Sequence, residues 1–209
     1  MWRFNIVIRY KEKIYINISM EKLNDLYENY QQNTNNNELK NKIINYLNKN
    51  IKLVNEEEIK LTESIENLAD TFNTVLINIS GMLKREYKND IKLSLYHTFI
   101  ETVIEKKKKE PISLFLIHIY KNDEFRENIL KKNDSFFLND DDKYDKLIKG
   151  DLNKMKKLFE FKDYWGQMNE KLKEYIKNSC VTLINISEVY IKEKADLNVI
   201  NEIKTLQHS

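Results

Sequence analysis

The chain has 209 residues and a mass of 25.3 kDa, and its 35 basic and 33 acidic side chains leave a net charge of only +2. A nearly balanced chain has no overall field to steer it toward nucleic acid or an anionic membrane, so such binding would need a local patch. Hydrophobic residues make up 41% of the sequence, which is enough for a core and excludes a wholly disordered chain. The three glycines and single proline favour long helices joined by polar turns.

Residues 2–19 alternate between apolar and polar side chains in two runs, with the charged residues 11–13 between them. A period of two is typical of strands, so this segment predicts a β-hairpin with one apolar face. The tetrapeptide INIS, which occurs three times in the chain, is therefore expected to be a strand at its first occurrence. Ser19 is a natural N-cap for the element that follows.

The period becomes helical after Ser19, and the asparagine-rich residues 33–37 end this first helix in a polar loop. A second, short helix is expected over residues 39–47. Residues 51–61 fit either a short strand pair or a loop, and the pattern does not choose between them.

A strong helical pattern starts at Thr62 and contains the second INIS, with Asn78 and Ser80 expected to face away from the apolar stripe. Asp90 is expected to cap the next helix. The side chains that predict the buried stripe of that next helix recur at three and four residues: Ile91, Leu95, Phe99, Ile100, Val103 and Ile104.

Pro111 suits a first helical turn, and residues 112–120 after it are apolar nearly all round, which predicts the central buried helix of a bundle. A short helix is expected from Asp123, and Phe136 and Phe137 are expected to anchor the irregular stretch after it. Further helices are predicted over residues 147–161 and 169–194, followed by a terminal amphipathic segment. The third INIS is then helical, and the two LINIS copies fit either coincidence or a duplicated hairpin.

No metal, cofactor or catalytic motif is recognisable. His97, His118 and His208 lack a second ligand at metal-binding spacing, and the acidic residues Asp140, Asp141 and Asp142 lack the turn glycine of a calcium loop. The three glycines are isolated, so no phosphate-binding loop is present. Cys180 is expected to be a buried, inert thiol.

The sharpest charge cluster is Lys106, Lys107, Lys108 and Lys109. These lysines are candidate contacts to phosphates or to a partner, although a basic helix C-terminus is the simpler explanation of them. The longest apolar stretch is too short to span a membrane, and the N-terminus does not have the pattern of a signal peptide, so an intracellular, non-secreted protein is expected. The N-x-S pattern of INIS then has no glycosylation route.

The stretch from SFFLNDD to the final long helix resembles a family of short uncharacterised proteins of nucleocytoplasmic large DNA viruses. The likeness covers roughly residues 95–190. It rests on a phenylalanine pair before an acidic loop, a tryptophan before the last long helix, and aromatic and aliphatic positions within that helix: Phe136, Phe137, Trp165, Tyr175, Leu183 and Tyr190. The resemblance implies a viral protein located in the host cytoplasm, a virus factory or the virion, and it transfers no site residue.

The predicted fold is mainly α, an irregular multi-helix bundle with an N-terminal β-hairpin. Residues 1–60 hold the hairpin and short helices packed on the bundle of residues 61–209, in one compact domain overall. The predicted function is non-enzymatic, that of a structural or protein-interaction protein such as a virion component or assembly factor, with protein partners or copies of itself. The alternatives are a nucleic-acid accessory factor that uses the lysine run and a Bcl-2-like helical mimic that binds a host protein.

Overall fold

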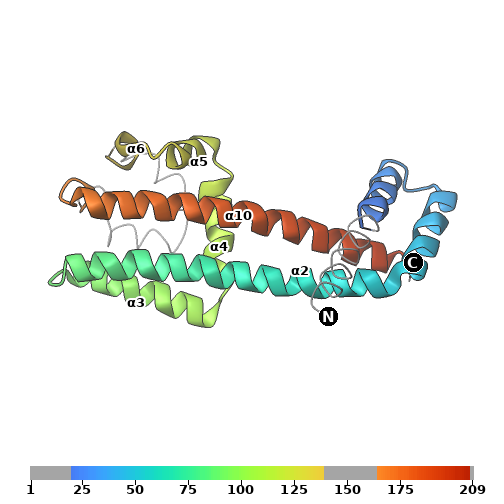
Figure 1. Cartoon of the computed structure of the whole chain (residues 1–209), viewed down its shortest axis with the longest axis horizontal. Coiled ribbons are helices and arrows are strands. Elements are labelled where there is room, and N and C mark those ends of the chain that lie inside the picture. Colours follow the sequence, from blue (N-terminus) through green and yellow to red (C-terminus); the bar gives the residue numbers. More distant parts are fainter. Residues whose placement is uncertain (1–19, 139–163, 208–209) are drawn as a thin grey trace, which may run out of the picture. The chain divides into compact units, whose positions relative to one another are not determined.

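The computed structural model describes residues 20–138 and 164–207, and every regular element within these two ranges is a helix (Figure 1). The predicted mainly α fold is therefore confirmed at this level. The predicted N-terminal hairpin, the helix over residues 147–161 and the acidic Asp140–Asp142 segment lie outside the described residues. The chain divides into two compact units, residues 1–66 with 191–209 and residues 67–190, and each is considered by itself. The predicted boundary near residue 60 stays a prediction.

The first unit consists of a helix over residues 20–32, the N-terminal part of α2 (Asn37–Glu86) and the C-terminal part of α10 (Glu170–Thr205). Residues 33–36, three asparagines and Thr34, form the turn between the first two helices, as predicted. Eight buried side chains from these three helices make the core of the unit: Leu23, Tyr27, Ile43, Leu47, Val54, Leu61, Ile200 and Ile203. Polar contacts surround this core, including a hydrogen bond of 2.5 Å from the Tyr27 hydroxyl to Glu202 and an ion pair between Lys204 and Glu58.

Helix α2 covers 50 residues with one kink. The predicted short helix over 39–47 lies before this kink, whereas residues 51–61 are helical and do not form the predicted strand pair or loop. A single residue, Asn50, has non-helical backbone angles (φ −116°, ψ 15°) and kinks the helix. Its side-chain amide donates to the Tyr46 carbonyl at 2.8 Å. The acidic side chains of residues 56–58 made this region look irregular in sequence, but the apolar residues Val54, Leu61 and Ile65 continue the helical spacing and are buried.

The second unit is built on the C-terminal part of α2 and the N-terminal part of α10, with α3 (Ile91–Lys106), α4 (Glu110–Phe115), the π-helical turn η1 (Leu116–Tyr120), α5 (Asp123–Leu130) and α6 (Asp134–Leu138) around them (Figure 1). Ten buried side chains form one core, eight from α2, α3, α5, α6 and α10 and two, Trp165 and Met168, from the residues just before α10: Leu83, Leu93, Phe125, Ile129, Phe136, Trp165, Met168, Leu172, Ile176 and Ile184. The predicted anchoring role of Phe136 is confirmed, since its ring packs edge-on against Phe125 at 5.0 Å between centroids.

Residues 112–120 do not form the predicted central helix. They begin in α4, change to the π-helical turn η1, and bury only Ile112. Ile117 is 57% exposed. Most other side chains of the segment are half-buried. The change to a π-helical turn interrupts the 3.6-residue spacing, so apolar side chains on every face are not all buried.

The final helix was predicted to end near residue 194, whereas α10 continues unbroken to Thr205. Both LINIS copies are helical, as predicted, but their serines are buried. Ser80 is 1% exposed and Ser187 is not exposed at all, which corrects the expectation that Ser80 faces away from the apolar stripe. Within the described ranges, none of the helices combines the length and apolar character needed to cross a bilayer.

Candidate binding surface

The turn between α2 and α3 fixes the position of the candidate surface. Asp90 caps α3, as predicted, because its Oδ1 accepts the Leu93 backbone N–H at 3.1 Å. Its Oδ2 accepts the Tyr164 hydroxyl at 2.7 Å, and the Tyr164 ring packs edge-on against Tyr87. The hydrogen bond from Tyr164 lowers the pKa of the Asp90 carboxyl, against a smaller opposing effect of burial. The carboxylate therefore joins the start of α3 to the segment that precedes α10.

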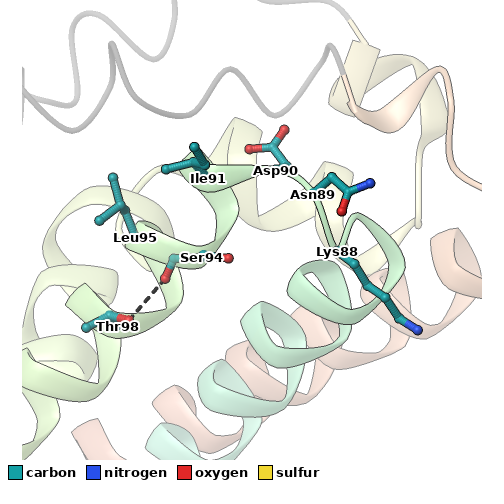
Figure 2. A pocket seen from close by; sticks show the side chains of 7 residues that line it. All are labelled: Lys88, Asn89, Asp90, Ile91, Ser94, Leu95 and Thr98. Carbon is teal, nitrogen blue, oxygen red and sulfur yellow. Dashed lines mark hydrogen bonds between the residues drawn. The ribbon is translucent and has the colours of Figure 1, made fainter.

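A shallow hollow of about 200 Å³ lies against this turn and the first two turns of α3 (Figure 2). Its lining combines polar groups of the turn with apolar groups of the helix: Lys88, Asn89, Asp90, Ile91, Ser94, Leu95 and Thr98. Figure 2 shows Ile91, Leu95 and Thr98 on one side of α3, with the Lys88 side chain turned away from them. The hollow is thus a short apolar surface with a capped helix start at one end.

The outward face of α3 carries exposed apolar side chains, which corrects the prediction that its whole stripe is buried. Ile91 is 75% exposed, Leu95 54% and Phe99 41%, whereas Leu93 is 1% exposed. A helix of 16 residues with apolar side chains at eight of them has more apolar positions than one core-facing stripe can take. We call Ile91, Leu95, Thr98, Phe99 and Thr102 the α3 stripe.

The two threonines of the α3 stripe present methyl groups rather than unsatisfied hydroxyls. The Thr98 hydroxyl donates to the Ser94 carbonyl at 3.1 Å, and the Thr102 hydroxyl donates to the Thr98 carbonyl at 2.8 Å (Figure 2 shows the first of these bonds). A hydroxyl that already has a partner within its own helix loses little when water is removed from it. The stripe is therefore less polar than its sequence suggests.

The predicted lysine contacts lie at the other end of α3. Lys106 is exposed in the last turn of the helix, and Lys107 is its C-cap and pairs with Glu110 at 3.5 Å. Lys108 pairs with Asp70 of α2 at 2.8 Å, and its carbonyl accepts the Asn73 side-chain amide. These contacts hold the α3–α4 turn on α2, so part of the run has a structural role.

The histidines are separated in the structure. The His97 Nδ1 lies 2.9 Å from the Ser80 hydroxyl, and its Nε2 lies 3.4 Å from Glu101. This order of serine, histidine and glutamate resembles a catalytic relay, but Ser80 is 1% exposed and its hydroxyl also contacts carbonyls of its own helix. The arrangement joins α3 to α2 without access for a substrate. His118 lies in η1, and His208 is outside the described residues.

No group of three potential metal ligands occurs among residues 20–138 and 164–207. Cys180 is half-buried, less than predicted, beside the core of the second unit, and loss of surrounding water raises the pKa of its thiol to about 12. The group is therefore a neutral thiol at physiological pH, which agrees with the predicted inert role.

No protein-family model matches the chain, and neither a curated protein nor a solved structure shows significant similarity to it. Sequence reasoning missed the α3 stripe as a surface. The available signal was the number of apolar positions on α3. Thr98 and Thr102 follow Leu95 at intervals of three and four residues, which places them on the same face of the helix.

Proposed function

We propose that the chain is a non-enzymatic protein-interaction protein that binds its partner through the α3 stripe. The supporting observation is the exposure of Ile91 and Leu95 on a helix whose start is fixed by Asp90 and whose opposite face is held by Leu93 in the core. The backbone of a rigid, packed helix loses little conformational freedom on binding, so apolar area on it favours association more than the same area on a loop.

The viral resemblance supplies the proposed setting, a virion component or an assembly factor of a large DNA virus. Structural proteins of this kind need surfaces that contact other proteins and have no requirement for a reactive centre. The buried Ser80 hydroxyl and the neutral Cys180 thiol are consistent with that role, because the first is out of reach of solvent and the second is not a thiolate.

Affinity capture with matched variants tests the proposal. Leu95→Lys places a charge on the α3 stripe, and Ile117→Lys does the same at a similarly exposed position on η1 (54% against 57% exposed). We expect wild type and Ile117→Lys to recover the same proteins from cells that express the chain, and Leu95→Lys to lose at least one. Capsid proteins among those lost would support the virion setting.

An unchanged set of captured proteins with Leu95→Lys would contradict a binding role for the α3 stripe. Recovery of polymerase subunits that depends on Lys106 rather than Leu95 would instead favour a nucleic-acid accessory factor. Circular dichroism of each variant establishes that the substitution at an exposed position has left the helices intact.

A further inference from the structure

The α3 stripe has the spacing of a short coiled-coil seam. Ile91, Leu95, Thr98 and Thr102 follow one another at intervals of four, three and four residues, and at 3.6 residues per turn they fall within an arc of about 60°. This is the pattern of alternating d and a positions. Because the opposite side of α3 holds Leu93 in the core of its own unit, only this one seam is available to another helix.

The charges beside the seam differ between its two flanks. Lys92 and Lys106 lie at e positions with Phe99 between them, and Glu101 lies at a g position on the other flank. In a parallel helix pair, a g residue of one helix lies beside the e residue five positions later in the other. Glu101 therefore lies beside the partner helix's residue 106, which is a lysine in this sequence. An antiparallel pair brings like flanks together, so Lys106 would face the basic flank again.

We propose that the α3 stripe binds a second copy of this chain, with the two α3 helices parallel and in register. This inference rests on the proposed function and names its partner. Two-fold symmetry forms the Glu101–Lys106 pair twice, once on each side of the seam. The satisfied hydroxyls of Thr98 and Thr102 allow their methyl groups to enter the seam without loss of a hydrogen bond.

The pair is expected to be weak. One helix of 16 residues buries less than the ~800 Å² per partner of a standard interface, and Glu105 at the last d position meets its own copy across the seam. In free peptides, Leu at an a position with Ile at a d position favours assemblies of more than two helices. Each α3 already has one face covered by its own unit, so we expect the assembly to stop at two helices. Association at micromolar or higher concentration, as a two-copy species, is the expected behaviour.

Sedimentation with charge-exchanged variants of the full chain tests the register. Glu101→Lys alone and Lys106→Glu alone each place two like-charge contacts beside the seam, and we expect about tenfold weaker self-association for either. An equimolar mixture of the two variants restores both opposite-charge pairs in the mixed species, so it should associate as well as wild type. Glu105→Leu should tighten the pair by a similar factor.

Cysteine cross-linking provides the direct geometric test. Thr98→Cys places two thiols across the seam at a d layer, and we expect a disulfide-linked dimer under mild oxidation. Thr74→Cys is the matched control, because Thr74 is likewise exposed and likewise bonded to its own helix, but lies on α2. Failure of Thr98→Cys to cross-link faster than this control, or a sedimentation mass above two copies, would overturn the proposed pair.

The outcomes for the two proposals are separable. A wild-type chain that remains monomeric at several hundred micromolar, while Leu95→Lys still loses a captured protein, overturns the self-pairing and leaves the proposed function standing. A monomeric chain whose captured proteins are unaffected by Leu95→Lys overturns both.

Discussion

Removal of the Asp90 carboxylate should destabilise the second unit by about 2 kcal/mol. Loss of the N-cap bond to Leu93 costs about 1 kcal/mol when the capping residue becomes alanine. The hydrogen bond from Tyr164 to the carboxylate adds about 1 kcal/mol, which is below the ~1.5 kcal/mol low end for a charged partner because water screens the half-buried Asp90. Tyr164→Phe keeps the ring against Tyr87 and loses only the second contribution, about 1 kcal/mol.

The double variant separates the two contributions. Asp90→Ala already removes the partner of the Tyr164 hydroxyl, so adding Tyr164→Phe should cost almost nothing more, and the coupling energy should be about 1 kcal/mol. The assay is urea unfolding at pH 7. Trp2→Phe in all variants leaves Trp165, which is buried in the core of the second unit, as the fluorescent reporter.

A coupling energy below about 0.3 kcal/mol would refute the reasoning, because it would mean that the hydroxyl and the carboxylate contribute independently. Asp90→Asn is the control for the cap itself. Asparagine caps helices about as well as aspartate, so this variant should retain most of the contribution of the Leu93 bond.

Three further predictions concern pH, backbone conformation and thiol reactivity. Because the pKa of Asp90 is lowered in the folded chain, its stabilising contribution is present above the unfolded pKa of about 4 and is lost as pH falls through the folded pKa. The difference in unfolding free energy between wild type and Asp90→Asn should therefore be constant from about pH 7 to 5 and shrink below about pH 4. A difference that grows in acid would contradict this. Lys132 has a φ of 51°, a backbone conformation that glycine adopts without strain. Lys132→Gly should therefore raise the free energy of unfolding in urea by up to about 0.5 kcal/mol, even though it removes the exposed ion pair with Glu174. A marked loss of stability would show that this ion pair outweighs the backbone strain. Cys180, with a pKa of about 12, should react with iodoacetamide at pH 8 at least about a hundredfold more slowly in the native chain than in urea, and equal rates would contradict its burial.

The sequence predicted helices well where one apolar stripe faced one core. The last long helix is an example, since Leu172, Ile176, Leu183 and Tyr190 recur at helical spacing and all are buried. Asp90 was also predictable as a cap, because the chemistry of an N-cap is local and needs no knowledge of the tertiary structure.

The errors arose where burial depends on neighbours that the sequence does not place. The apolar residues of α3 lie on more than one face, and only packing against α2 and α10 decides that Leu93 is buried while Ile91 is exposed. The same holds for residues 112–120, which are mostly apolar although only Ile112 among them is fully buried. The α3 stripe was missed for the same reason. Which face of α3 is exposed depends on which face packs in the core, and the sequence alone does not show this.

The kink at Asn50 has a consequence for how changes in this chain should be interpreted. Ile43 and Leu47 precede the kink and Val54 follows it, yet all three side chains lie in the core of the first unit, so the bend at Asn50 is part of how α2 packs there. Alanine at position 50 has the better intrinsic tendency to form helix. Asn50→Ala should therefore favour a straight helix at the kink and weaken the packing of the first unit. The expected result is unchanged or higher helicity by circular dichroism together with a lower midpoint of urea unfolding. At this position, we expect a residue that is less favourable for a helix than alanine to make the folded chain more stable.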